Sequence, residues 1–290
     1  MPFFFLLSGV LVQARIERDA PGFGRSLFTR IAWPYFLWST VQLVIIHLLG
    51  TLANRPVEDV VHPILSLPWQ TVSQFWFLYA LFVLHGLALL TLRPLGASGF
   101  LALCIAFKVA CVLLPVPEAL RAAGNQAPYY ALGVALGAEG LRRIAAASPA
   151  WLTLPLVCAA AAAALGAALF LTIAAHPDML RASAGKVTSL AWRPAMIPVA
   201  LLCVLAAAML AAIAAGRLKD GLVLLGRRAM AIYILHIMAI AGLRIVAMKL
   251  FGIGNAWALL PVLVMAGIVA PLIAYAVAKR LGLARALTLD

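Results

Sequence analysis

The chain has 290 residues, of which 66% are hydrophobic and only 11% are charged. Soluble domains carry about 25% charged residues, so this composition excludes an ordinary soluble protein and predicts an integral membrane protein. The net charge of +13 does not indicate a nucleic-acid partner, because Lys and Arg at the ends of membrane spans set topology.

The first residues, MPFFFLLSGVLVQ, are uncharged and form a short run for a membrane span. A secretory signal has basic residues before its apolar stretch and small residues after it. Here the order is reversed, because Arg15 and Arg18 follow the apolar run. We interpret it as a membrane helix that enters the cytoplasm at Arg15, which places Met1 on the outer side.

Further stretches approach the ~20 apolar residues that a helix needs to cross a ~30 Å bilayer core. They are 31–53, 72–92, 99–117, 127–141, 151–175, 194–216, 229–250 and 256–278. Together with the opening run they predict an all-α polytopic bundle of about nine spans, in one domain covering 1–290. When the opening run crosses inward, basic residues concentrate in the cytoplasmic loops and the C-terminus is cytoplasmic, as the positive-inside rule requires.

The 4 cysteines all lie in apolar stretches, without CxxC pairs or metal-ligand spacing to histidine. We therefore expect neither a disulfide framework nor a metal site. The carboxylates are few, and only Glu139 approaches membrane depth, which argues against a pump that uses a carboxylate relay.

The loop at 14–30 combines four arginines with turn-forming Pro and Gly residues, and it continues into RIAWPYFLWS. One interpretation is a topology-setting loop followed by an interfacial aromatic belt. The other is a cytoplasmic site for a phosphate-bearing ligand, in which Arg25 and Arg30 supply charge-assisted contacts.

The aromatic stretch FWFLYALFVLH spans residues 75–85. An interfacial belt explains Trp76 and Tyr79 as well as a pocket does. His85 lies deeper in the same helix, where an ionisable side chain usually faces the bundle interior.

A second polar helix face is expected within 229–250. Tyr233 and His236 are three residues apart, on one face of the helix, and Arg244 follows about two turns later. These side chains form either a polar packing contact or a proton-handling or substrate-binding face, since histidine titrates near neutral pH.

Four motifs, MPFFFLLSG, RIAWPYFLWS, FWFLYALFVLH and AIYILHI, resemble in this order those of the acyltransferase 3 family. The likeness is to its members that acetylate fucose and cell-surface glycans. It implies an enzyme of about ten spans that transfers an acyl group, typically acetyl, from cytoplasmic acyl-CoA to a hydroxyl of an extracytoplasmic sugar. Acyl-CoA is then a co-substrate, no cofactor is bound permanently, and the expected home is the plasma (inner) membrane of a bacterium.

The resemblance also implies roles for individual residues. Arg25 and Arg30 match the basic loop that meets the acyl donor, Trp76 matches the aromatic motif, and Tyr233 with His236 matches the motif of the penultimate helix. The acceptor pocket is expected to contain Trp76, Tyr79, Tyr233 and Arg244. The family's catalytic histidine precedes the PFFFLLSG helix, so its role has no counterpart after Met1.

Several alternatives stay open on this sequence. A start codon assigned too late, or a true truncation, would each explain the missing first helix. His236 or His85 could instead replace the family's base. A transporter or flippase without covalent chemistry, or an inactive relative of the acyltransferases, would also fit the hydropathy.

Overall fold

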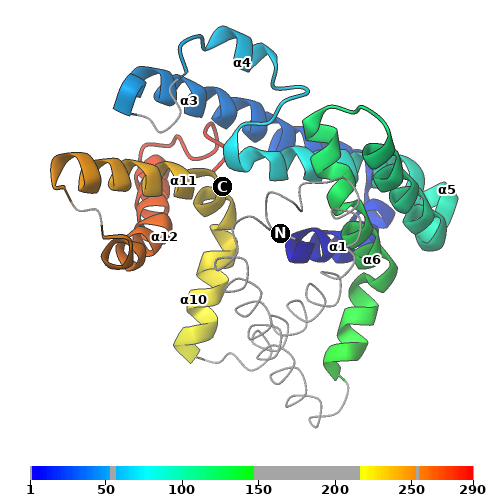
Figure 1. Ribbon diagram of the computed structural model, residues 1–290. Helices are drawn as coiled ribbons and strands as arrows, with labels where there is room; N and C mark the ends of the chain where they lie inside the picture. Colours follow the sequence, from blue (N-terminus) through cyan, green and yellow to red (C-terminus); the bar gives the residue numbers. More distant parts are fainter. Residues whose placement is uncertain (1, 53–56, 147–215, 253–254, 290) are drawn as a thin grey trace. The chain divides into compact units, whose positions relative to one another are not determined.

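A computed structural model describes residues 2–52, 57–146, 216–252 and 255–289, and these residues are helical or in connecting turns, with no strand among them (Figure 1). The all-α prediction is confirmed. The predicted span 151–175, and all but the last residue of the predicted span 194–216, lie outside the described residues. The chain divides into two compact units, which are described one at a time: unit 1 is Met1–Gly24, Val83–Val116 and Leu120–Ala215, and unit 2 is Arg25–Phe82, Pro117–Ala119 and Gly216–Asp290.

The helices follow the apolar stretches of the sequence closely. In chain order they are α1 (Pro2–Arg18), α2 (Ala20–Leu27), the π-helical turn η1 (Phe28–Ala32), α3 (Trp33–Leu49), η2 (Gly50–Leu52), α4 (Val61–Leu65), η3 (Ser73–Phe75), α5 (Trp76–Leu113), α6 (Glu118–Ala146), α10 (Gly216–Arg227), α11 (Ala229–Ile245), η5 (Val246–Leu250) and α12 (Ala256–Arg280).

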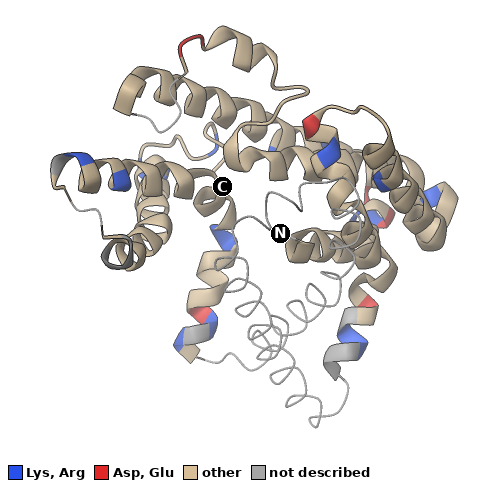
Figure 2. Cartoon of the chain, in the orientation of Figure 1, with Lys and Arg blue, Asp and Glu red and all other residues tan. Residues whose placement is uncertain are grey.

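Four described segments are long and apolar enough to cross a membrane. They are Ala20–Leu52, Ser73–Leu113, Ala229–Lys249 and Leu259–Arg280. Figure 2 shows that charged residues are sparse along α3, α5, α11 and α12. This matches a lipid-facing bundle, in which apolar side chains cover the outer surface.

In unit 1, α5 is broken at Gly96, where φ is 65° and ψ is −179°. His85 and Phe100 lie on opposite sides of the break, 15 residues apart in sequence, which in a straight helix would separate them by about 22 Å. Both rings nevertheless lie against Tyr130, at centroid distances of 5.4 and 6.1 Å. The break therefore divides α5 into two segments that fold back on α6, as the separate predictions of 72–92 and 99–117 require.

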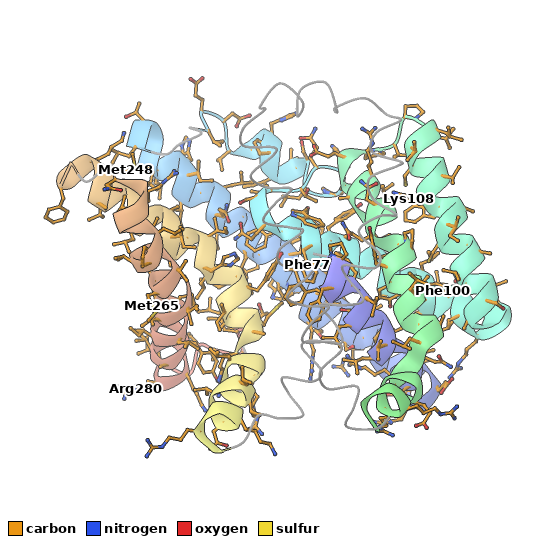
Figure 3. The ribbon with its side chains drawn as sticks, turned by 60° about the horizontal axis from the view of Figure 1, so that its bottom comes forward. Phe77, Phe100, Lys108, Met248, Met265 and Arg280 are labelled. Atoms are coloured by element: carbon orange, nitrogen blue, oxygen red, sulfur yellow. The ribbon has the colours of Figure 1, made fainter. Side chains whose placement is uncertain are left out.

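The helix α6 begins earlier than its predicted span. The hydropathy favours a start near 127, because Arg121, Asn125 and Gln126 lower it, whereas the helix runs from Glu118. Asn125 accepts a hydrogen bond from Lys108 of α5, at 3.4 Å, so this polar turn is held by side chains of the same unit. Figure 3 shows Lys108 and Phe100 on the same segment of α5.

The helices α1 and α6 touch through their backbones in unit 1. A Cβ atom at Gly133 would lie 2.0 Å from the Leu6 carbonyl oxygen, and one at Gly9 would lie 2.0 Å from the Tyr130 carbonyl oxygen. Only glycine lets two helices approach so closely, which is a common device in membrane bundles. The opening run of the sequence is thus a packed helix of the bundle.

In unit 2, contacts between helix ends fix the relative directions of α3, α11 and α12. Lys249 donates to the Thr51 carbonyl beyond the end of α3, and Trp38 near its start donates to the Leu287 carbonyl, beyond α12. Arg228 at the start of α11 stacks on Tyr275 near the end of α12. Thus α3 and α11 run in one direction and α12 in the other; in Figure 3, Met248 and Arg280 mark opposite ends of this group.

Candidate functional site

Tyr233 and Gln74 join α11 to the turn before α5. The Tyr233 hydroxyl donates to the Gln74 backbone carbonyl, and the Gln74 side-chain amide donates to the Ile234 carbonyl, at 3.3 Å. Two reciprocal hydrogen bonds therefore fix the start of α5 against α11. The preceding Ser73 has a positive φ of 47°, so the backbone enters α5 through a conformation that is uncommon for a non-glycine residue.

A polar face of α3 contacts the Gln74 side chain. Gln74 Nε2 also donates to Gln42 Oε1, at 3.1 Å, and Ser39 lies one turn before Gln42 on the same face of α3. All three side chains are buried. Among the described residues, Ser39 Oγ and Gln74 Oε1 have no hydrogen-bond partner, although buried polar atoms are nearly always paired.

Two further tyrosines hold the chain segment that precedes Gln74. The hydroxyl of Tyr35 donates to the Leu67 carbonyl at 2.6 Å, and that of Tyr79 donates to the Pro68 carbonyl at 2.9 Å. Their rings pack edge to face, with centroids 5.7 Å apart. Tyr79 thus lies in unit 2 near the residues described above, and its hydroxyl holds a loop carbonyl.

His236 lies on α11, one turn after Tyr233. Its Nδ1 is 2.7 Å from the Tyr233 carbonyl and 3.1 Å from the Ile232 carbonyl. Because a carbonyl only accepts, Nδ1 carries the proton, which leaves Nε2 as the acceptor of the neutral ring. The neutral ring of the half-buried His236 therefore presents Nε2 as a hydrogen-bond acceptor, and its role as a base stays a prediction.

Arg244 lies two turns beyond His236, near the end of α11. It is half-buried and has no hydrogen bond or ion pair with a residue of the described chain. The pairing of Tyr233 and His236 on one face is observed, with ring centroids 6.2 Å apart. A shared function with Arg244 stays a prediction.

Arg25 and Arg30 lie on α2 and on η1, and both are exposed. The turn η1 is closed by a bond from the Trp33 amide to the Phe28 carbonyl, five residues apart. Such a π turn aligns residues five apart more closely than an α-helix does, and it often occurs at functional sites. Neither guanidinium group has an ion pair with a residue of the described chain, and their binding of one anionic group stays a prediction.

His85 and Trp76 belong to different units and are described separately. His85 belongs to unit 1, where its ring stacks on Phe23 at 5.5 Å and packs against Tyr130. Trp76 is half-buried in unit 2 and packs edge to face on Phe77, at 6.4 Å. Both histidine candidates are thus embedded in aromatic clusters, one in each unit.

The sequence analysis missed the buried side chains Ser39, Gln42 and Gln74. Two polar residues three positions apart inside the apolar stretch 31–53 were a signal, because polar groups inside a span usually face the bundle interior. The involvement of Gln74 depends on a contact between distant segments, which hydropathy does not report. No group of metal-ligating side chains occurs among the described residues.

The fold and composition define a helical membrane protein with polar side chains buried between its spans. The profile of the acyltransferase 3 family, described as an acyltransferase domain, matches residues 1–279. The chain belongs to this family. Neither the curated proteins nor the solved structures give a significant match.

Proposed function

We propose that this protein transfers an acyl group, typically acetyl, from cytoplasmic acyl-CoA to a hydroxyl group of a cell-surface carbohydrate. The family match over residues 1–279 carries the proposal. Arg25 and Arg30 support the donor side, since both are exposed near the start of the apolar segment Ala20–Leu52, before α3. The proposed setting is a bacterial inner membrane with the C-terminus in the cytoplasm.

In the proposed reaction, the proton of the acceptor hydroxyl passes through a general base to the CoA thiolate. A general base accepts the proton of the acceptor hydroxyl while the oxygen attacks the thioester carbonyl. The carbon–oxygen bond forms, the carbon–sulfur bond breaks, and the CoA thiolate takes up the proton. Arg25 and Arg30 hold the donor's phosphates in this scheme, and a site that excludes water protects the thioester from hydrolysis.

The base of this reaction can be assigned experimentally. His236 has a free Nε2 in its neutral form, whereas the family resemblance places a catalytic histidine before the α1 helix. Activity should therefore be compared between the 290-residue chain, a form extended through any upstream in-frame codons, and His236→Ala in each. Loss in His236→Ala of the unextended chain would assign the base to His236.

The proposal is tested with membranes that contain the protein and acetyl-CoA labelled in the acetyl group. We expect label in the surface polysaccharide, released as acetate by mild alkali because an ester is formed. Arg30→Ala should raise the KM for acetyl-CoA about tenfold, the loss of one charge-assisted contact. Arg285→Ala, an equally exposed arginine on the C-terminal segment, is the control and should leave this KM unchanged.

Two outcomes would overturn the proposal. Folded wild-type protein, in unextended and extended form, that labels no carbohydrate would indicate an inactive relative. Accumulation of unmodified glycan outside the cell, dependent on the protein but not on acetyl-CoA, would instead indicate a transporter.

A further inference from the structure

Unit 1 contains a cavity of about 260 Å³ between the end of α1 and the middle of α5. Helix α1 contributes Gln13, Ile16 and Glu17 to its lining, and α5 contributes Leu92, Arg93 and Gly96. Ile16 and Leu92 are buried, whereas Glu17 and Arg93 are exposed. The cavity therefore combines an apolar wall with two opposite charges that solvent can reach.

The break in α5 forms one corner of this cavity. Gly96 has a φ of 65°, a conformation that glycine adopts at little cost. Arg93 belongs to the last turn before the break and Ala97 follows it directly, and both line the cavity. The cavity thus lies where the chain changes direction beside α1.

The cavity also lies at the level where two apolar stretches end. The uncharged run of α1 ends at Gln13, and Arg15 and Arg18 follow in the last turn. The first apolar stretch of α5 ends at Arg93, whose Nη2 donates to the Ile16 carbonyl at 2.9 Å. Charged residues gather where a span leaves the hydrocarbon core, so the cavity is placed at the level of lipid headgroups.

Hydrogen bonds within the protein hold the polar groups of the cavity in place. Gln13 Nε2 donates to Glu17 Oε1 at 2.9 Å, one turn along α1. This bond leaves Glu17 Oε2 and Gln13 Oε1 as acceptors with no partner among the described residues. Arg93 uses one N–H for the Ile16 carbonyl, and its guanidinium group carries further donors.

Glu17 and Arg93 line one cavity without pairing with each other. Among the described residues, the ion pairs join Glu139 to Arg142 and Arg143, and neither Glu17 nor Arg93 takes part in one. A ligand in the cavity therefore meets acceptor oxygens from α1 and a guanidinium group from α5. It satisfies both when it carries an anionic group and a cation with N–H donors.

We propose that this cavity binds the zwitterionic headgroup of phosphatidylethanolamine. Arg93 binds the phosphate, which a planar guanidinium group suits, and Glu17 with Gln13 accepts hydrogen bonds from the ammonium group. The acyl chains of the lipid remain in the bilayer beside the apolar wall. This inference goes beyond the proposed acyl transfer and does not depend on it.

The two charges predict a choice among membrane lipids. Phosphatidylglycerol offers a phosphate but no cation, so the Glu17 carboxylate gains no partner and repels the anion. Phosphatidylcholine offers a cation without N–H groups, which cannot donate a hydrogen bond to Glu17 or Gln13. Free O-phosphoethanolamine has the same charged groups as phosphatidylethanolamine but is soluble in water, so the two sources can be told apart by experiment.

Native mass spectrometry of the purified 290-residue chain tests this proposal. The protein in detergent is mixed with one of the three lipids, all with identical acyl chains, and the Kd of the first bound lipid is measured. We expect phosphatidylethanolamine to bind about tenfold more tightly than either of the other two, the value of one charge-assisted hydrogen bond.

Variants separate the two halves of the site. Glu17→Gln should bring phosphatidylethanolamine to within about twofold of phosphatidylcholine, whereas Arg93→Gln should weaken all three lipids about tenfold, since each has a phosphate. Glu139→Gln and Arg142→Gln, at exposed positions of the same unit, are the matched controls and should change nothing. The lipid preference is a ratio measured on one protein sample, so a partial loss of folded protein does not alter it.

Three results would overturn the proposal. Equal affinities for the three lipids, or a preference for phosphatidylethanolamine that survives Glu17→Gln, would show that the cavity does not recognise the ammonium group. Displacement of the bound lipid by free O-phosphoethanolamine, at concentrations close to the Kd of the lipid, would show that the occupant is a soluble zwitterion.

Discussion

The close approach of α1 and α6 at Gly9 and Gly133 makes a quantitative prediction for the stability of unit 1. In Gly133→Ala, the new Cβ would lie 2.0 Å from the Leu6 carbonyl oxygen and 3.0 Å from the Val10 nitrogen. A close carbon–oxygen contact in proteins is about 3.3 Å, so α1 and α6 must separate by roughly 1.3 Å. The obstructing atoms belong to the backbone of a helix, and no change of rotamer can relieve the clash.

The cost follows from this geometry. Overpacking a well-packed core costs about 1–3 kcal/mol, and the reciprocal contact at Gly9 places Gly133→Ala at the upper end, near 3 kcal/mol. That is a decrease of about 100-fold in the folding equilibrium. The matched control is Gly86→Ala, also in unit 1, where no atom lies within 4 Å of the added Cβ. It should be neutral or stabilising by up to about 1 kcal/mol, because alanine favours a helix over glycine.

The assay is the unfolding of the purified protein in detergent by added dodecyl sulfate, followed by tryptophan fluorescence. We expect Gly133→Ala to unfold at a clearly lower dodecyl sulfate fraction than the wild type. The double variant Gly9→Ala/Gly133→Ala should lose less than the sum of the single losses, because helices that are already apart accommodate the second methyl group. Equal midpoints for Gly133→Ala and Gly86→Ala, or strict additivity, would refute the backbone contact.

Two contacts in unit 2 give further predictions. Arg228→Ala should lower the free energy of unfolding by about 2 kcal/mol, because the guanidinium carbon lies 4.1 Å from the ring centroid of Tyr275 and Arg228 Nη1 donates a hydrogen bond to the Tyr275 hydroxyl. Arg227→Ala, at an exposed neighbour, should change this free energy by less than about 0.5 kcal/mol, and equal effects would contradict the stacking. Trp38→Phe removes the indole N–H that donates to the Leu287 carbonyl, a hydrogen bond worth about 1 kcal/mol. Carboxypeptidase should therefore digest the C-terminal segment about fivefold faster. An unchanged rate would show that this hydrogen bond does not hold the segment.

Hydropathy predicted the helical class and the approximate place of the described spans because both depend on local composition. The stretches 31–53, 229–250 and 256–278 contain α3, α11 with η5, and α12 almost in full. The error at 127–141 has the same origin: a helix whose first turns carry Asn125 and Gln126 looks like a loop to a hydropathy window. Asn125 is tolerated in the helix because Lys108 of the same unit donates a hydrogen bond to its side chain.

The candidate site was predicted less completely, and the reason is topological. Tyr233 and His236 could be placed on one helix face, because their spacing is a local property of α11. Gln74, which bonds to both α3 and α11, comes from a segment that the sequence presents as an outer loop followed by a span. Its position depends on the chain turning back at Leu67, and no periodicity in the sequence encodes that turn.

Tyrosine hydroxyls pair backbone carbonyls of the irregular segment that precedes α5. Leaving a polar group unpaired in an apolar environment costs several kcal/mol, so the buried carbonyls of an irregular segment need hydrogen-bond donors. Tyr35, Tyr79 and Tyr233 do this at three successive places, by donating to Leu67, Pro68 and Gln74. Tyrosine suits the task because its ring is apolar while its hydroxyl reaches a partner. Two tyrosines that fit an interfacial belt in the sequence, Tyr35 and Tyr79, therefore act here as hydrogen-bond donors to backbone carbonyls of the segment before α5.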